Sequence, residues 1–268
     1  MTLQARALLK RVAAATDRVL PPPAGVVVLI YHRVGGGSAS EVDLDPAVFD
    51  AQLAHLAEHH RVLSLDAAVD GLVSGQPVEG VVLTFDDGTA DFTDHVVPAL
   101  VNRNLPATLY AATRFIDEGI DFPWGAPPIS WAELRDATAT GLVTVGSHTH
   151  SHWLLDRLDA GTIDDDLDRS IDLIGQHLGS APSHFAYPKA LPGSPAAEIA
   201  VRRRFRSAAL AANRVNRPGH ADVHRLWRTP IQRSDTTEFF TTKARGGMRL
   251  EGELRSLVSR LKYRGQSR

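Results

Sequence analysis

Two clusters of side chains that could carry out hydrolysis follow short apolar runs in this sequence. The first is Thr84–Gly88, with the letters TFDDG, and the second is His148–His152, with the letters HTHSH. Adjacent carboxylates and paired imidazoles, both delivered from strand ends, can build one divalent-metal site with a free carboxylate beside it. That combination suits a hydrolase that attacks a carbonyl group with a metal-activated water.

The composition narrows the class of protein. A chain of 268 residues with 43% hydrophobic residues is ordinary for one barrel-type domain with a continuous core. The net charge of −2 gives no reason to expect a nucleic-acid partner. Because there are no cysteines, disulfides and thiolate–metal sites are excluded, and only histidine and carboxylate ligands remain for a metal.

The first twenty residues predict an amphipathic helix that ends at Pro21–Pro23. Apolar side chains recur there at helical spacing: Leu8, Val12, Ala15 and Val19. The longest apolar run in this stretch, Val12–Ala15, is shorter than the ~7–15 residues of a signal-peptide core. No segment of the chain approaches the ~18 apolar residues of a membrane span. The expected location is therefore the cytoplasm, with membrane association as an option considered below.

Short β-rich runs alternate with helical patterns along the chain, which is typical of a parallel sheet built from βα units. Seven runs predict strands: Val26–Tyr31, Val81–Thr84, Ala107–Ala111, Leu142–Val145, His184–Tyr187, Arg206–Ala211 and Leu226–Ile231. The predicted fold class is α/β, a single distorted (β/α)7-type barrel over residues 24–240, either closed or incompletely closed. Residues 1–23 are assigned to the N-terminal helix and proline linker, and residues 241–268 to a basic amphipathic helix or tail.

Helices are predicted between these strands. Asp45 caps one, a second starts near Ser130, and the clearest spans Thr162–Leu178 with Gly179 as its stop. Asp164–Asp166 fall in the first predicted turn of that helix, where acids complement the helix dipole, so a structural role is preferred over metal binding.

In barrels of this type the chemistry lies at the C-terminal ends of the strands. Candidate residues follow four of the predicted strands: His32, Asp86 with Asp87, His148 with His152, and Pro188. They therefore converge on one rim. The irregular, proline-rich loop 117–130 is expected to line the mouth of the site.

The two leading motifs together resemble those of the polysaccharide deacetylase family, carbohydrate esterase family 4. Phe185–Pro188 resembles the third family motif, and Trp131 with Glu133 and Leu134 resembles the helix before the second. The resemblance spans about residues 26–235. It implies a metal-dependent enzyme that removes N-acetyl groups from amino sugars in a glycan substrate. The implied cofactor is a divalent metal; Zn²⁺ fits the ligands, and cobalt or nickel stays open.

The family pattern assigns Asp87, His148 and His152 to the metal and Asp86 to the general base. His150 is expected to point away. The usual Leu-x-His motif is absent, because Leu226-Trp227-Arg228 stands in that region. Instead, Ile30–Val34 is similar to the permuted poly-N-acetylglucosamine deacetylases, in which the N-terminal histidine serves. His32 is therefore the predicted general acid, with His220 or His224 as the alternatives.

Two departures from the family pattern affect the predicted site. Ala186 stands where the family has an arginine, and we expect Arg228 to supply that guanidinium, the alternative being a structural ion pair. Lys189 follows the motif proline in place of an aromatic residue, but its backbone N–H can still form an oxyanion hole. Tyr187, Pro188 and Lys189 are therefore the predicted substrate-binding residues.

Two alternatives to N-deacetylation stay open: a sugar O-acetyl esterase, and a glycan-binding member of the family that has lost turnover. The C-terminal stretch leaves a second choice. An apolar stripe is followed there by cations with no acid among them: Arg255, Arg260, Lys262, Arg264 and Arg268. This pattern predicts either a helix docked on the barrel or peripheral contact with an anionic membrane.

Overall fold

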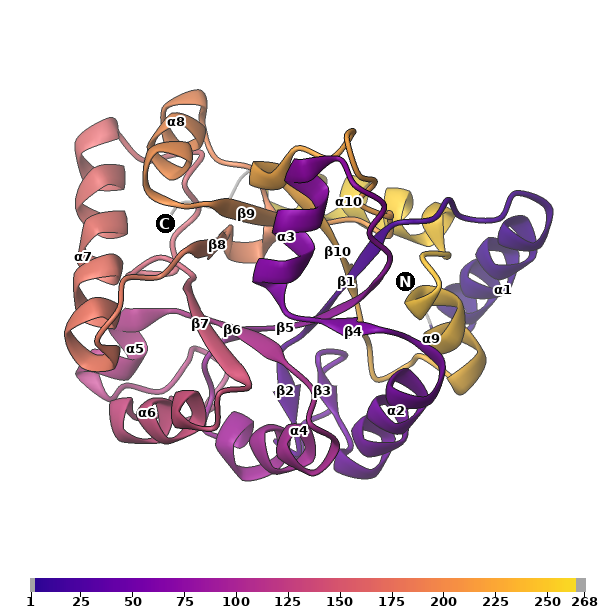
Figure 1. Cartoon of the computed structure of the whole chain (residues 1–268), viewed down its shortest axis with the longest axis horizontal. Coiled ribbons are helices and arrows are strands. Elements are labelled where there is room, and N and C mark those ends of the chain that lie inside the picture. Colours follow the sequence, from indigo (N-terminus) through magenta and orange to yellow (C-terminus); the bar gives the residue numbers. More distant parts are fainter. Residues whose placement is uncertain (1–2, 264–268) are drawn as a thin grey trace.

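Parallel strands surrounded by helices make up the computed structural model, which describes residues 3–263 (Figure 1). Seven strands form a ring in the order β1 (Val26–Tyr31), β10 (Leu226–Pro230), β9 (Ser207–Ala211), β8 (His184–Ala186), β7 (Val143–Ser147), β6 (Ala107–Ala111) and β5 (Gly80–Asp87). The ring closes because β1 pairs with both β10 and β5. The predicted barrel is confirmed, and it is closed rather than open.

The strand ends differ from the prediction in one place that matters for the site. β5 runs from Gly80 to Asp87, so both acids of the TFDDG motif belong to the strand rather than to the loop after it. Three short strands were not predicted: β2 (Arg33–Val34), β3 (Asp43–Leu44) and β4 (Val62–Leu63). Each has two residues, which is too few to show an alternating pattern in the sequence.

Helices follow most of the strands and cover the outside of the barrel (Figure 1). They are α2 (Pro46–His59), α3 (Leu65–Ser74), α4 (Val97–Arg103), α5 (Thr113–Glu118), α6 (Trp131–Ala139), α7 (Ala160–Leu178), α8 (Pro195–Arg204) and α9 (Thr237–Ala244). Short π and 3₁₀ turns lie at Phe92–Val96, Pro188–Ala190 and Val223–Arg225. The predicted cap Asp45 accepts the Ala47 N–H at 2.8 Å. The helix predicted to start near Ser130 does so, and Ser130 forms a capping box with Glu133.

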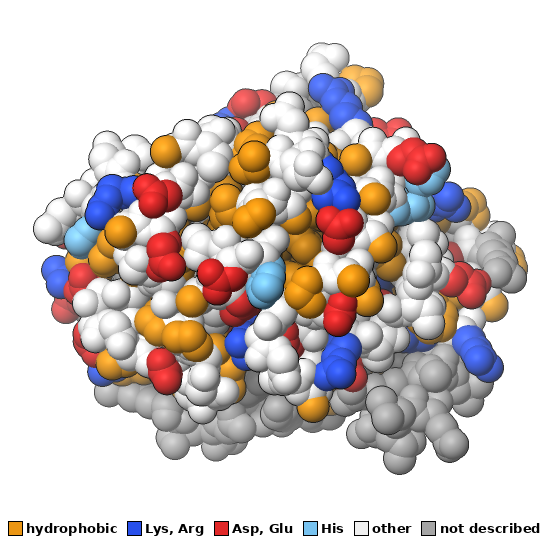
Figure 2. All heavy atoms as spheres, turned by 90° about the horizontal axis from the view of Figure 1, so that it is seen from below, with side chains coloured by type: hydrophobic (Ala, Val, Ile, Leu, Met, Phe, Trp, Pro, Cys, Tyr) orange, Lys and Arg blue, Asp and Glu red, His pale blue; other side chains and the backbone are white. Residues whose placement is uncertain are grey.

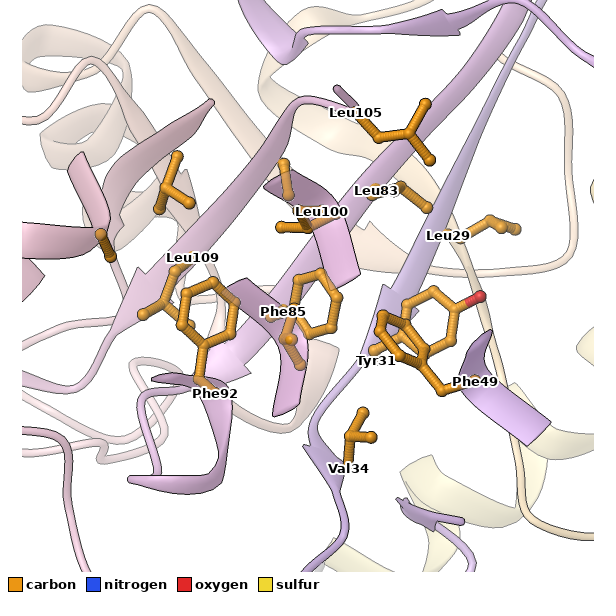
Figure 3. Close-up of a cluster of buried hydrophobic side chains, with 14 of the residues drawn as sticks. Leu29, Tyr31, Val34, Phe49, Leu83, Phe85, Phe92, Leu100, Leu105 and Leu109 are labelled. Atoms are coloured by element: carbon orange, nitrogen blue, oxygen red, sulfur yellow. The ribbon is translucent and has the colours of Figure 1, made fainter. Parts of the chain in front are cut away.

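The hydrophobic core has two layers, because alternate residues of each strand face opposite sides. The outer layer lies between strands and helices, where Tyr31 stacks on Phe85 with ring centroids 5.2 Å apart and meets Phe49 edge-on (Figure 3). The inner layer includes Val28, Val82, Tyr110, Ala186 and Leu226, together with Leu65 and Val69 of α3. α3 thus packs on the interior layer, at the end where the strands begin.

The terminal helices α1 (Leu3–Val19) and α10 (Arg249–Tyr263) lie on one side of the barrel together with α9 (Figure 1). The predicted N-terminal helix is present, but it packs through Ala13 and Ala14 against Phe239 and Met248. Val12 and Val19 of the predicted apolar stripe are 46% and 79% exposed. Arg264 and Arg268 of the predicted basic tail lie outside the described residues.

None of the helices within residues 3–263 has the length and apolarity needed to cross a bilayer. Figure 2, which views the molecule from below, shows acidic, basic and apolar side chains interspersed over that face. The described side chains there form no continuous field of one sign, as expected of an exterior that is simply solvated.

Candidate active site

A pocket of about 640 Å³ opens at the C-terminal ends of the strands. Six of the predicted site residues line it: His32, Asp86, Asp87, His148, His152 and Lys189. Tyr187 and Pro188 do not, because the Tyr187 ring packs 5.0 Å from the Phe185 ring in the core and Pro188 is buried. The structure therefore brings together the residues predicted for metal and proton chemistry, and only part of the predicted substrate contact.

Asp87, His148 and His152 form a set that fits a divalent metal. The Nε2 atoms of His148 and His152 lie 3.6 and 3.2 Å from Asp87 Oδ1, and the three ligand atoms are all within 4.8 Å of one another. Bonds of about 2.1 Å to a tetrahedral ion put neighbouring ligand atoms about 3.4 Å apart. Among the side chains that the structure describes, no other group of three acids or histidines has this spacing.

The protonation states also suit metal binding, which requires neutral imidazoles and ionised carboxylates. Burial lowers the pKa of His148 to about 4, against the raising effect of Asp86. Its Nδ1 lies 2.7 Å from the Ala186 carbonyl oxygen and, as the N–H donor of the neutral ring, leaves the Nε2 lone pair facing Asp87. Burial raises the pKa of Asp87, but the contact with His152 outweighs this effect and holds that pKa well below its usual range.

Asp86 lies beside this trio and is held by Arg228. Two hydrogen bonds join them, from Arg228 Nη1 to Asp86 Oδ1 at 2.5 Å and from Nη2 to Oδ2 at 2.9 Å. The guanidinium is fully buried, donates also to the Leu210 carbonyl, and lies 5.1 Å from the Tyr110 ring. Although burial raises the pKa of Asp86, the charge of Arg228 keeps it below its usual range. This is the geometry that the hypothesis about Arg228 requires.

Unusual backbone conformations gather around the pocket. Adjacent strand residues normally face opposite sides of a sheet, yet Asp86 and Asp87 both line the pocket. Asp87, the last residue of β5, has a φ of 77°, and His152 and Lys189 have φ values of 61° and 54°. Such left-handed conformations are costly for residues other than glycine and occur most often at functional sites. The chain turns sharply at the residues that the chemistry needs.

Asp166 of α7 holds the HTHSH loop in place. Its buried carboxylate accepts the backbone N–H groups of His150 at 3.2 Å and Ser151 at 2.9 Å. α7 begins at Ala160 with Asp159 as its cap, two residues before the predicted start, so Asp164–Asp166 lie beyond the first turn. The prediction that these acids act on the helix dipole is therefore wrong for Asp166. Its place between Ile163 and Ser170 on the buried face was the available signal.

The rest of the loop is also fixed by hydrogen bonds. Thr149 Oγ1 accepts the His152 N–H at 2.8 Å, and Ser147 Oγ accepts the Thr149 N–H at 3.2 Å. His150 Nδ1 lies 3.1 Å from Thr113 Oγ1, and His150 does not line the pocket. As predicted, this middle histidine lies apart from the other two.

His32 enters the pocket from the segment after β1. Its Nδ1 is buried and makes no hydrogen bond with any described residue. Asp91, which sequence reasoning missed, fixes this segment by accepting the Val34 N–H at 2.8 Å and pairing with Arg33 at 3.3 Å. The alternatives His220 and His224 do not line the pocket, and His224 Nε2 bonds the Phe205 carbonyl oxygen at 2.8 Å.

The structure is an α/β barrel that carries, at its C-terminal rim, a histidine–carboxylate trio that could hold a metal and a further acid beside it. The profile of the family described as polysaccharide deacetylase matches residues 74–206 of the chain, which contain Asp86, Asp87, His148 and His152. The chain belongs to the polysaccharide deacetylase family.

Two curated proteins of Escherichia coli, from strain K12 and from O157:H7, are similar to part of the chain. Both are poly-beta-1,6-N-acetyl-D-glucosamine N-deacetylases, 28% identical over 149 residues. The match covers 49% of this chain and 22% of each relative, so the chain corresponds to only a portion of those longer proteins.

Solved structures show the same fold. IcaB from Ammonifex degensii superposes with a TM-score of 0.74 at 26% identity, over 84% of this chain and 98% of that one. The Streptococcus pyogenes deacetylase PplD, determined in complex with acetate, has a TM-score of 0.71 at 21% identity, over 83% of this chain and 99% of that one. The second likeness concerns the fold alone.

Proposed function

We propose that this chain is a metal-dependent hydrolase that removes N-acetyl groups from amino sugars within a glycan. The observation that carries the proposal is that the two adjacent acids at the end of β5 have different partners. Asp87 joins His148 and His152, while Asp86 is bonded to Arg228 beside them and lines the same pocket. A protein that only bound a glycan would have no need of an ionised carboxylate next to a metal-ligand set.

Asp87, His148 and His152 would hold the ion, and Zn²⁺ fits their chemistry. When bound, such an ion lowers the pKa of a water molecule and polarises the carbonyl of the substrate amide. Asp86 takes the proton of the attacking water, since the charge of Arg228 keeps it ionised and the two hydrogen bonds fix its orientation. Arg228 thereby positions the base without touching the substrate.

His32 delivers a proton to the leaving nitrogen, so that acetate and a free amine result. Its support is its place in the pocket and a buried Nδ1 that no described residue engages. The backbone N–H of Lys189 stabilises the developing oxyanion, as a main-chain donor at the edge of the pocket.

Acetate release from N-acetylated oligosaccharides tests this proposal. Asp86→Asn is expected to abolish release while the protein still binds metal, and His148→Ala is expected to lose the metal itself. His150→Gln is the matched control, because this histidine lies two positions away in the same loop and faces Thr113. Release that persists in Asp86→Asn, or a His148→Ala variant that keeps its metal, would contradict the assignment.

The choice between amide and ester hydrolysis depends on His32. An amine is a poorer leaving group than an alcohol, so loss of a general acid injures amide cleavage more than ester cleavage. We expect His32→Gln to reduce acetate release from an N-acetylated sugar by about 10²–10⁴-fold, and from an O-acetylated sugar by much less. Equal losses on both substrates would argue against the acid role.

Peripheral membrane contact through the terminal helix also belongs to this proposal. Leu250, Leu254 and Val258 of α10 recur at helical spacing and are 39%, 40% and 54% exposed. An exposed apolar stripe on a helix rich in arginine suits the surface of an anionic bilayer. Sedimentation with phosphatidylglycerol vesicles, compared with phosphatidylcholine vesicles, tests this. Loss of sedimentation in Leu254→Ser is expected, and equal recovery with both vesicle types would contradict it.

A further inference from the structure

Two cationic side chains on one arc of the rim have no role in the mechanism above. Lys189 follows β8, and Arg255 comes from α10, yet both line the pocket that holds Asp86 and Asp87. Ala211 at the end of β9 and Pro230 at the end of β10 line the same arc. A helix outside the matched family region thus contributes a charged group to the candidate active site.

Arg255 is held in place with hydrogen-bonding capacity to spare. Its Nη2 donates to Asn213 Oδ1 at 2.7 Å, and the Asn213 side chain donates in turn to the Met248 carbonyl oxygen at 2.9 Å. The Nη1 atom is buried and makes no hydrogen bond with any described residue. A guanidinium has five N–H donors in a fixed fork, so this one is oriented while its second nitrogen is left available.

The acid nearest to Arg255 is shared with other cations. Glu251 Oε1 lies 3.9 Å from Arg255 Nη1, beyond hydrogen-bonding distance. The same carboxylate lies 3.4 Å from Lys243 and 4.0 Å from Lys10. Asp235 also pairs with Lys10 at 2.7 Å and with Lys243 at 2.8 Å, so two acids are shared among these three cations. Of the three, Arg255 is the one that lines the pocket.

Lys189 has no acidic partner among the described residues. Its Nζ lies 5.3 Å from the centroid of the Trp124 ring, a cation–π contact with the loop that lines the mouth. The residue itself is exposed. The ammonium group is thus held at the pocket edge by an aromatic face and stays free to meet an anion.

The acids of the pocket are already engaged. Asp86 is paired with Arg228, and Asp87 belongs to the metal-ligand set. Arg33, a third cation of the lining, is paired with Asp91 and lies 3.8 Å from Asp43. Among the described residues Lys189 is left without an acidic partner, and Arg255 has only Glu251, 3.9 Å away and shared with two lysines. A neutral N-acetylglucosamine polymer offers them no partner either.

We propose that the pocket binds an acidic glycan, whose carboxylate or phosphate, on or next to the N-acetylated sugar, is held by Arg255 and Lys189. This rests on the proposed function, because it names the class of substrate for that site. The planar guanidinium matches the two oxygens of a carboxylate or phosphate, and the ammonium adds a point charge. The trio and Asp86 would then act on an acetamido group whose sugar is oriented by its anionic neighbour.

Binding of charge-matched sugars tests the proposal directly. The probes are a hyaluronan tetrasaccharide and an N-acetylmuramic acid disaccharide, each against its methyl ester, and N-acetylglucosamine 6-phosphate against N-acetylglucosamine. Calorimetry on the metal-loaded His32→Gln protein measures affinity with little turnover. At least one acidic probe should bind about ten-fold or more tighter than its neutral partner, as charge-assisted hydrogen bonds require. The phosphate and carboxylate arms separate the two sources of the anion.

Substitutions test whether Arg255 and Lys189 cause the preference for acidic over neutral probes. Arg255→Gln combined with Lys189→Gln should reduce it to about two-fold or less, and Arg203→Gln, an exposed cation on α8, should leave it unchanged. Thermal unfolding of each variant shows that folding is intact. The proposal is wrong if no acidic probe is preferred, or if the preference survives the double substitution.

Failure of the anion-subsite proposal can be distinguished from failure of the proposed hydrolase function. Equal acetate release from the acidic and neutral members of each pair would leave the hydrolase in place and remove the anion subsite. Preferred binding of an acidic probe, with no acetate released from any sugar by the wild-type protein, would leave the subsite and remove the hydrolase.

Discussion

The two ends of the barrel each carry a histidine bonded to an acid, and only one end is suited to chemistry. At the C-terminal rim, Asp87 meets His148 and His152. At the opposite end, His184 Nδ1 lies 2.8 Å from Ser207 Oγ and its Nε2 lies 3.1 Å from Asp66 Oδ1. By residue type and distance the second group looks like a serine–histidine–aspartate triad.

The two clusters differ in their access to the pocket and in whether their polar atoms already have hydrogen-bond partners. Ser207 and His184 are fully buried, neither lines the pocket at the rim, and both ring nitrogens of His184 already have partners. At the rim, two Nε2 atoms converge on one carboxylate beside a pocket of about 640 Å³. Catalysis needs side chains that face the substrate and still have a free lone pair or N–H group. A buried network in which every polar group already has a partner stabilises the fold instead.

The largest difference should come from matched histidine substitutions at the two ends. His148→Ala should lose the metal and reduce acetate release by at least about 10³-fold, since a bound ion supplies several kcal/mol to the transition state. His184→Ala should keep both metal and activity per folded molecule, and lose about 1–3 kcal/mol of stability from unsatisfied buried partners. Metal analysis, acetate assays and urea unfolding check this. Similar activity losses in both variants would break the comparison.

Aspartates at the two ends sharpen the same contrast. Asp86→Asn should lower kcat by about 10²–10⁴-fold, as for removal of a general base, and leave the metal bound. Asp66→Asn should leave kcat unchanged, because Asp66 is half exposed and its bonds to described residues go to His184 and Arg206, at the end of the barrel away from the pocket. An Asp86→Asn variant with wild-type kcat would show that some other group accepts the proton.

Neighbouring acids on α7 test how the rim loop is held. Asp166→Ala should weaken metal binding by about 10–100-fold, because the loop that carries His148 and His152 loses two hydrogen bonds. Asp165→Ala is the control, since that side chain is exposed one position earlier. Metal titration with a competing chelator measures both. Equal metal affinities in the two variants would show that Asp166 does not hold the metal-binding loop in place.

Low pH should reduce the stability that the cluster of His184, Ser207 and Asp66 contributes, because His184 becomes protonated. Burial lowers the pKa of His184 from its usual 6.5, against the raising effect of Asp66, so the folded state favours the neutral ring. The unfolded chain then binds more protons, and this contribution to stability is complete above about pH 6.5 and falls away below it. Between about pH 7.5 and 5.5, wild type should lose more urea resistance than His184→Ala. A loss of the same size in both would contradict the assignment.

The strands of the barrel were predictable because most are runs of apolar or β-branched residues, and because strands such as Val26–Tyr31 and Ala107–Ala111 are buried on both faces. The convergence of Asp87, His148 and His152 followed from a topological rule, since the C-terminal ends of parallel strands meet at one rim. Each motif can therefore be found locally in the sequence, and the fold rule brings the motifs together.

Contacts across long sequence distances were harder to predict. Asp166 was assigned to the helix dipole, although its partners are the backbone N–H groups of His150 and Ser151, in the loop before the helix. Arg255 was assigned to a basic helix, and only packing of α10 beside Asn213 brings it to the pocket. The buried face of α1 was also obscure, because alanines at 13 and 14 fit the tight contact better than the larger apolar stripe does.

Anomalous diffraction from crystals of the zinc-loaded protein tests the central claim most directly. The account predicts a zinc peak at bonding distance, about 2.0–2.2 Å, from Asp87, His148 Nε2 and His152 Nε2, with Asp86 still bonded to Arg228. A zinc ion held by Asp86 in place of Asp87, or no zinc at the rim under saturating metal, would contradict it.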